Sequence, residues 1–238
     1  MIFENEYRVE IEDVDKDNLL SNRALLGIFE DIACFHAATL GQGPLEVSTN
    51  GFAWLLLNWR VKVIKRSVYG DVLTVKTWPR QFDRISSYRD FEVLDESGEV
   101  VAIGSSKWFV MDLGSRRPVR LTEEYTNPYC PITDVSVFGD DMPKLNEPDE
   151  YEYKTEYTVS RRDIDSNKHM HNINYLDLAY EVLPEEVFEN NDFKNIAIEY
   201  KKEVIYKDKL DCYYSKNEEN HVVTIKTGDK VNAIIVLS

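Results

Sequence analysis

Apolar residues recur at two different spacings near the start of the chain, and the change of spacing predicts the first two elements. Residues 6–12 alternate between apolar and polar side chains, which is typical of a strand. The stretch that leads up to Gly41-Gln42-Gly43-Pro44 instead repeats apolar side chains every three or four positions, as the buried face of a helix does. This stripe consists of Leu25, Ile28, Phe29, Ile32, Phe35 and His36. Either Ser21 or Asn22 is placed to cap this helix, and the breaker after Leu40 ends it.

Strand patterns then follow in series. They cover residues 52–65, 71–82, 86–94 and 100–113. The last two are separated by Asp95-Glu96-Ser97-Gly98, which predicts a hairpin turn. One strand, one long helix and four antiparallel strands together predict an α+β unit.

The same order of elements returns in the second half of the chain. A strand is predicted near residues 151–159, followed by a shorter helix that is interrupted at Pro184. Further strands are predicted at residues 195–206, 210–215, 221–227 and 231–237. Between the halves the periodicity lapses into an acidic stretch with several Pro and Gly residues. We therefore expect a first domain at residues 1–121, a linker at 122–150 and a second domain at 151–238.

The two halves also share identical residues at one offset. Tyr7, Val9, Asp13, Asp15 and Asn22 recur 150 positions later, as Tyr157, Val159, Asp163, Asp165 and Asn172. Five identities without a gap favour an internal duplication. A second resemblance aligns residues 59–64 with 200–205 at an offset of 200 − 59 = 141. These alignments place Asp17, Leu19 and Lys62 opposite Asn167, His169 and Glu203, so reactive groups are expected only in the second half.

The polar stretch from Arg161 to Tyr175 carries the candidate chemistry. Asp165, Asn167 and His169 are two positions apart, so an extended backbone would place them on one face. Asn172 is placed to cap a helix, and the N–H groups at a helix start favour developing negative charge. The residues alone also fit a solvated polar turn that leads into a helix.

Composition narrows the classes of function. The chain has 238 residues, 43% of them hydrophobic, and a net charge of 28 − 43 = −15, which argues against nucleic-acid binding through a basic surface. The three cysteines, Cys34, Cys130 and Cys212, are far apart and form no CxxC pair, so we expect reduced thiols and no zinc site. No secretory signal and no apolar run of membrane-spanning length are evident. We expect a cytoplasmic protein that does not enter a membrane.

Two motifs identify a family resemblance. Residues 165–175, DSNKHMHNINY, are similar to the D-x-N-x-H-V-N-N-x-x-Y motif of acyl-ACP thioesterases, the plant plastid enzymes and their bacterial relatives. Residues 198–204, IEYKKEV, are similar to the L-E-Y-R-R-E-C motif of the same family. The resemblance covers nearly the whole chain. Lys168, His171 and Val204 depart from it, since plant members have glutamine, asparagine and cysteine there. The resemblance implies a tandem double hotdog, with two antiparallel sheets each wrapped around a helix.

The resemblance also implies an activity and a set of catalytic residues. The activity is hydrolysis of the thioester of fatty acyl-ACP, which releases a free fatty acid and holo-ACP by activated water. The implied catalytic residues are Asp165, Asn167, His169 and Glu203. Either His169 or Glu203 could serve as the general base. No metal or cofactor is expected, because His169, His171 and Asp163 make only a weak candidate for a metal site.

Further residues are candidates for holding the substrate. An acyl chain needs an apolar tunnel, for which the candidates are Ile28, Phe52, Trp54 and Trp59. An acidic acyl carrier protein needs a basic patch, for which the candidates are Arg116, Arg117 and Arg120, or the basic pairs at residues 161–162 and 201–202. Two other readings stay open, an acyl-CoA thioesterase or hydratase of double-hotdog type and a non-catalytic acyl-thioester-binding module. The sequence fits either a monomer or a homodimer.

Overall fold

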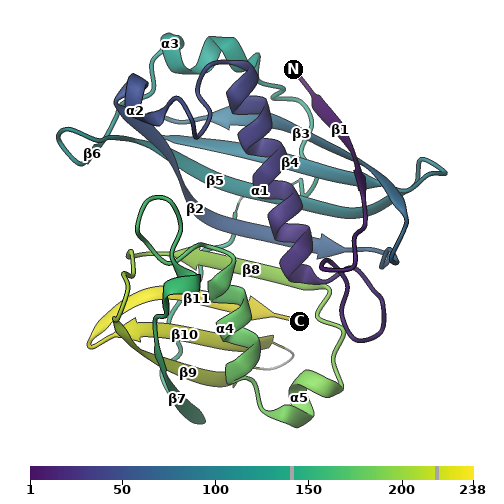
Figure 1. The fold of residues 1–238 in the computed structure, drawn as a ribbon, viewed down its shortest axis with the longest axis vertical. Helices are drawn as coiled ribbons and strands as arrows, with labels where there is room; N and C mark the ends of the chain where they lie inside the picture. Colours follow the sequence, from purple (N-terminus) through teal and green to yellow (C-terminus); the bar gives the residue numbers. More distant parts are fainter. Residues whose placement is uncertain (140–141, 218–219) are drawn as a thin grey trace. The chain divides into compact units, whose positions relative to one another are not determined.

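The computed structural model describes residues 1–139, 142–217 and 220–238, which divide into two compact units (Figure 1). Unit 1 comprises Met1–Leu57 and Val61–Met142, and unit 2 comprises Asn58–Arg60 and Pro143–Ser238. The division after Met142 lies within the stretch predicted as a linker, of which residues 140–141 lie outside the described part of the chain.

Unit 1 contains a sheet and one long helix. Its elements are β1 (Phe3–Arg8), α1 (Asn22–Thr39), α2 (Val47–Asn50), β2 (Phe52–Val63), β3 (Val72–Phe82), β4 (Ser86–Leu94), β5 (Val100–Asp112), β6 (Arg117–Pro118), α3 (Glu123–Thr126) and the 3-10 turn η1 (Asn127–Tyr129). The strand order is β1-β3-β4-β5-β2, with β6 beside β5. The β1–β3, β3–β4 and β4–β5 pairs are antiparallel.

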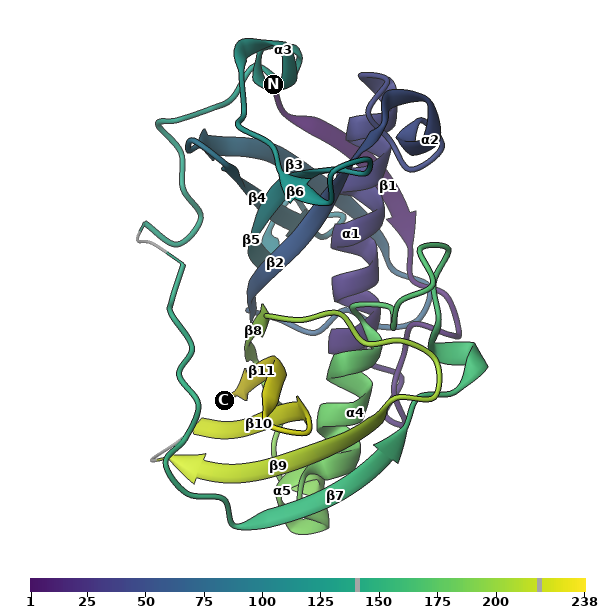
Figure 2. The same ribbon diagram turned by 90° about the vertical axis from the view of Figure 1, so that its left-hand side faces the viewer.

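Helix α1 lies along one face of this sheet (Figures 1 and 2). Ser21 caps it by accepting a hydrogen bond from the backbone N–H of Ala24 at 3.1 Å, so the predicted helix start is confirmed. The ring of Phe29 packs on that of Phe91 with 4.8 Å between centroids. A Cβ at Gly104 would lie 2.6 Å from Phe29, so the close approach of helix and sheet requires glycine there. Phe35, at the margin of the predicted stripe, is 53% exposed instead of buried.

Unit 2 repeats the plan with a shorter helix. Its elements are β7 (Tyr153–Thr158), the 3-10 turn η2 (Arg161–Asp163), α4 (Asn174–Val182), α5 (Glu185–Glu189), β8 (Asn195–Tyr200), β9 (Lys209–Asn217), β10 (Asn220–Thr227) and β11 (Lys230–Leu237). The strand order runs from residues of β2 through β8-β11-β10-β9 to β7. Pro184 separates α4 from α5, as predicted.

Two predictions about local structure are corrected in unit 2. The N-cap of α4 is Ile173 and makes no side-chain bond, so the predicted cap at Asn172 was wrong. The carbonyl of Asn172 instead accepts the hydroxyl of Tyr200 at 3.0 Å. The α+β class is confirmed, but two separate sheets are not shown. Asn58–Arg60, which belong to strand β2, group with unit 2.

Candidate active site

Residues 165–169 form a closed turn. One carboxylate oxygen of Asp165, Oδ1, accepts the backbone N–H groups of Asn167 at 2.8 Å and His169 at 3.1 Å. The backbone N–H of Asp165 donates to the carbonyl of His169 at 2.9 Å. Lys168, at the tip, has a positive φ of 67°. The backbone is therefore a turn, so the condition of an extended backbone, under which the three side chains would share one face, is not met. Asp165 stabilises this turn because its side chain accepts hydrogen bonds from the backbone N–H groups two and four residues ahead.

A buried carboxylate anchors this turn. Oδ2 of Asp163 accepts the hydroxyl of Tyr157 at 2.7 Å and both the N–H and the hydroxyl of Ser160, at 2.6 and 2.8 Å. Burial opposes ionisation, but these hydrogen bonds outweigh it and lower the pKa of Asp163. The carbonyl of Asp163 accepts the side-chain amide of Asn174 at 3.0 Å, which ties the turn to the start of α4. The anchor therefore links the turn to β7 and α4.

The segment after β8 brings Glu203 to the turn. An isolated β-bridge pairs His169 with Ile205, and the N–H of Met170 donates to the carbonyl of Val204 at 2.7 Å. These backbone contacts place Oε2 of Glu203 3.2 Å from Nε2 of His169. The two side chains are 28% and 47% exposed, so solvent and a substrate can reach both.

The four residues implied by the motifs thus adjoin one another within unit 2. The side-chain amide of Asn167 donates to Oδ2 of Asp165 at 3.4 Å, which completes the chain of contacts from Asn167 to Glu203. A carboxylate beside Nε2 favours the tautomer of His169 that carries its proton on Nε2. In this tautomer Nδ1 carries the lone pair. The arrangement offers a carboxylate–imidazole pair for proton transfer and an amide that can donate to an oxygen.

The predicted substrate-binding residues differ in exposure. Ile28 in unit 1 and Trp59, which groups with unit 2, are almost fully buried, at 6% and 1% exposure. Phe52 and Trp54 of unit 1 are half-buried. The ring of Phe52 meets that of Tyr125 edge-on at 5.1 Å, and the indole N–H of Trp54 donates to the side-chain carbonyl of Gln42 at 3.1 Å.

Basic side chains occur at both predicted docking positions. In unit 1, Arg116, Arg117 and Arg120 are exposed around β6. In unit 2, Arg161 and Lys207 lie 5.9 and 5.3 Å from the ring centroid of Tyr206, one residue beyond the bridge to the candidate site. Within the described residues, four exposed basic side chains of this region make no ion pair: Arg161, Lys168, Lys202 and Lys207.

The structure corrects the predicted counterpart of Glu203. The bridge between His169 and Ile205 recurs in unit 1 as a bridge between Leu19 and Val68, at an offset of 205 − 68 = 137. The counterpart of Glu203 is therefore Arg66, and the predicted pairing with Lys62 was wrong. The sequence holds a signal for this register, because Lys65, Tyr69 and Asp71 recur at the same offset as Lys202, Tyr206 and Asp208.

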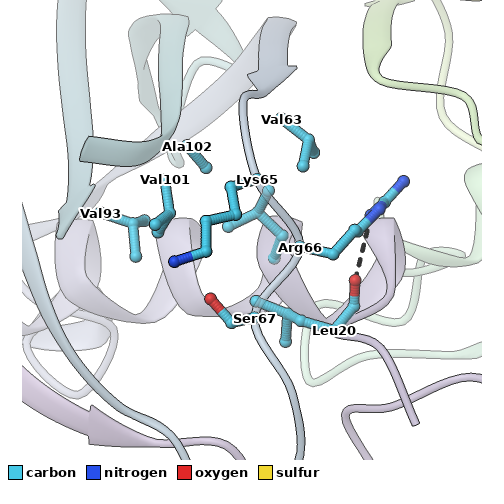
Figure 3. A pocket seen from close by; sticks show the side chains of 9 residues that line it. Leu20, Val63, Lys65, Arg66, Ser67, Val93, Val101 and Ala102 are labelled. Carbon is cyan, nitrogen blue, oxygen red and sulfur yellow. Dashed lines mark hydrogen bonds between the residues drawn. The ribbon is translucent and has the colours of Figure 1, made fainter. Parts of the chain in front are cut away.

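Arg66 is half-buried and held by hydrogen bonds. Nη1 of Arg66 donates to the carbonyl of Leu20 at 3.0 Å, the bond drawn as a dashed line in Figure 3, and to Oδ1 of Asn22 at 2.7 Å. The cavity beside it, lined among others by Val63 and Ser67, holds about 10 Å³, room for one water molecule.

The described residues offer little support for metal-dependent or thiol chemistry. No group of three His, Cys, Asp or Glu side chains in this part of the chain could hold a metal ion. Burial raises the pKa of the Cys34 and Cys212 thiols to about 12. Among the described helices, none is long and apolar enough to cross a membrane.

Family models match both halves of the chain. The acyl-ACP thioesterase N-terminal domain matches residues 1–129, and the acyl-ACP thioesterase C-terminal domain matches residues 146–237. The chain belongs to the acyl-ACP thioesterase family. Its relatives include oleoyl-acyl carrier protein thioesterase 2 of Arabidopsis thaliana, 26% identical over 95% of this chain and 66% of the relative. The palmitoyl-acyl carrier protein thioesterase of the same plant is 27% identical over 85% of this chain and 52% of the relative. The chain thus spans about two thirds or less of the length of these relatives.

Solved structures of this family share the fold. An acyl-ACP thioesterase from Bacteroides thetaiotaomicron superposes with a TM-score of 0.88 at 21% identity, over 99% of this chain and 96% of the other. The 12:0-ACP thioesterase from Umbellularia californica superposes with a TM-score of 0.86 at 20% identity, over 100% and 96%. At such identities the likeness establishes the α+β, double-hotdog type of fold and leaves the substrate open.

Proposed function

We propose that this chain hydrolyses the thioester of a fatty acyl-ACP, releasing the fatty acid and holo-ACP. The contact of 3.2 Å between Nε2 of His169 and Oε2 of Glu203 carries the proposal. It joins a residue from each of the two motifs that resemble the family. Membership of a family of acyl-ACP hydrolases supports it further.

In the proposed mechanism a water molecule attacks the thioester carbonyl. The His169–Glu203 pair takes a proton from this water as its oxygen bonds to the carbonyl carbon. The amide N–H of Asn167 donates to the oxygen that becomes negative in the tetrahedral intermediate. When the C–S bond breaks, the pair returns the proton to the leaving thiolate. Asp165 acts as a positioning residue, because both its oxygens bond groups of its own turn.

The groups that hold the substrate are also proposed. Ile28, Phe52, Trp54 and Trp59 contact the hydrocarbon chain, and Arg116, Arg117 and Arg120 contact the acidic carrier. Because Trp54 is half-buried, it is the best of the apolar candidates to test. Trp54→Ala should shift the preferred chain length while turnover of the best substrate stays within about tenfold, roughly 1.4 kcal/mol in the barrier.

The decisive assay measures fatty acids released from acyl-ACPs of graded chain length, with acyl-CoAs of the same lengths in parallel. We expect release from at least one acyl-ACP, and its loss in His169→Ala. Release from acyl-CoA alone would replace the proposal by an acyl-CoA thioesterase. Binding of acyl-ACP without release would replace it by a non-catalytic binding module. The family's carrier specificity makes acyl-ACP the substrate to test first.

A further inference from the structure

A second cluster of polar side chains lies in unit 1, buried between α1 and the sheet. His36, near the end of α1, is fully buried, and Arg89 of β4 is 6% exposed. Nη1 of Arg89 lies 3.1 Å from Nδ1 of His36 and donates to the hydroxyl of Thr77 at 3.2 Å. The candidate active site in unit 2 uses none of these residues.

The geometry determines where the proton of His36 lies. A guanidinium only donates hydrogen bonds, so Nδ1 of His36 must accept from Arg89. Burial, and next the charge of Arg89, lower the pKa of His36 to about 4, so the ring is neutral near pH 7. The single ring proton is therefore on Nε2. This atom is buried and has no hydrogen-bond partner in the described part of the chain.

Arg89 carries a positive charge that no carboxylate of the described residues neutralises. Burial lowers its pKa only to about 10, so it stays charged near pH 7. Its neighbour Asp90 is engaged elsewhere, with the hydroxyl of Ser105 at 2.8 Å, the N–H of Val137 at 3.1 Å and Nε of Arg80 at 3.6 Å. A buried charge without a counter-charge is costly, so the cluster favours an anion.

Besides the Cys34 thiol and the terminal ammonium of Met1, whose charge also lowers the pKa of His36, the neighbours of the cluster are aromatic. Phe3 stacks on the ring of His36 at 5.1 Å, and Tyr129 meets it edge-on at 5.4 Å. Trp54 and Phe82 lie 6.0 and 6.2 Å from the ring of Tyr129. Burial raises the pKa of the Tyr129 hydroxyl to about 12, so it supplies no negative charge near pH 7. The anion that fits a positive charge surrounded by aromatic rings is one with an anionic head group and an apolar remainder.

We propose that Arg89 and His36 form a binding site for the carboxylate of a fatty acid within unit 1. Arg89 supplies the charge, and the Nε2–H of His36 supplies the second donor that a carboxylate oxygen accepts. The hydrocarbon chain lies against the aromatic rings, and Phe3 and Tyr129 move aside to admit it. This proposal rests on the proposed function in one respect only, namely that the reaction produces a fatty acid. The site then binds product outside the candidate active site.

Titration calorimetry with the full chain tests this site, using decanoate and decanol below the concentration at which decanoate forms micelles. We expect decanoate to bind at least tenfold more tightly than decanol, and Arg89→Met to remove that preference. Arg84→Met, which changes an exposed arginine of the same unit, is the matched control and should keep it. Thermal unfolding of each variant establishes that it is folded.

A second measurement needs no variant in the cluster. In protein with ¹⁵N-labelled histidine, which has four histidines in all, decanoate should shift the Nε2 resonance of His36 and decanol should not. The proposal is wrong if the two ligands bind equally, if folded Arg89→Met keeps the preference, or if the His36 signal does not move. It is also wrong if His169→Ala removes the binding. Thioester hydrolysis is assayed separately, so failure of either proposal is distinguishable from failure of the other.

Discussion

The turn at residues 15–19 in unit 1 and the turn at 165–169 in unit 2 have the same backbone. Oδ1 of Asp15 accepts the N–H groups of Asp17 and Leu19 at 2.9 and 3.1 Å, and Oδ1 of Asp165 accepts the corresponding N–H groups at 2.8 and 3.1 Å. The fourth residue of each turn, Asn18 or Lys168, has a positive φ, of 60° and 67°. Formation of the turn therefore does not depend on the side chains that we propose as catalytic.

The two turns differ in the side chains that they carry and that lie beside them. Leu19 stands where unit 2 has His169, and Arg66 stands where unit 2 has Glu203. In unit 1 the arginine is bound to the carbonyl of Leu20 and the side chain of Asn22, whereas Glu203 faces an imidazole and is half exposed. The backbone of the turn is therefore separable from the side chains that it carries. The aspartate of each turn belongs to the scaffold, and in the proposed mechanism the histidine and the glutamate add the chemistry.

The largest expected effect comes from removing that chemistry. His169→Ala and Glu203→Gln should each lower kcat for acyl-ACP by about a hundredfold or more, which is the usual contribution of a general base. Leu19→Ala, the matched change in the turn of unit 1, should leave kcat within about twofold. Steady-state kinetics on one acyl-ACP measures all three. Equal losses in Leu19→Ala and His169→Ala would show that the two turns do not differ in function.

Substituting Asp15 and Asp165 separates an effect on stability from an effect on catalysis. Asp15→Ala and Asp165→Ala each remove the acceptor of two backbone N–H groups, so each should lower the free energy of unfolding by about 1–2 kcal/mol. Only Asp165→Ala should also lower kcat, because it loosens Asn167 and His169. Urea denaturation and kinetics on the same preparations give both quantities. If Asp165→Ala keeps full stability but loses activity, Asp165 has a direct chemical role.

Charge reversal can show which unit meets the carrier protein. Replacing Arg116 and Arg117 by Glu should raise KM for acyl-ACP several-fold more than KM for acyl-CoA, and the gap should narrow as salt screens the charges. The parallel variant in unit 2 reverses Arg161 and Lys207, which flank Tyr206. KM for both substrates is measured at two ionic strengths. If only the unit 2 variant raises KM for acyl-ACP more than KM for acyl-CoA, the docking surface is not at Arg116 and Arg117.

The smallest expected effect concerns the cysteines. Val204 stands where plant members of the family have cysteine, and burial raises the pKa of the Cys34 and Cys212 thiols to about 12. A thiol nucleophile needs the opposite shift, so hydrolysis should not pass through an acyl-cysteine. A variant with all three cysteines changed to alanine should keep activity within about threefold. Detection of an acylated cysteine by mass spectrometry during turnover would overturn direct hydrolysis by water.

The sequence by itself determined the elements that depend on local pattern. Helix α1 was predictable because its apolar stripe has helical spacing and Ser21 caps its start. The break at Pro184 was predictable because proline cannot continue a helix. The motif at residues 165–169 also named the side chains that the structure brings together. It did not disclose the turn, since the positive φ of Lys168 leaves no mark in the periodicity of apolar residues.

Only the tertiary structure decided which distant residues meet. The counterpart of Glu203 is Arg66 because bridges at Ile205 and Val68 set the register. The recurring residues at the 137 offset are a signal of it in the sequence, but the sequence offered a competing alignment at an offset of 141, and only the bridges decide between the two. The pairing of His36 with Arg89, 53 positions apart, follows from the packing of α1 on β4. Local periodicity reports which face of an element is buried. It does not report what that face is buried against, because that depends on how strands distant in sequence pair.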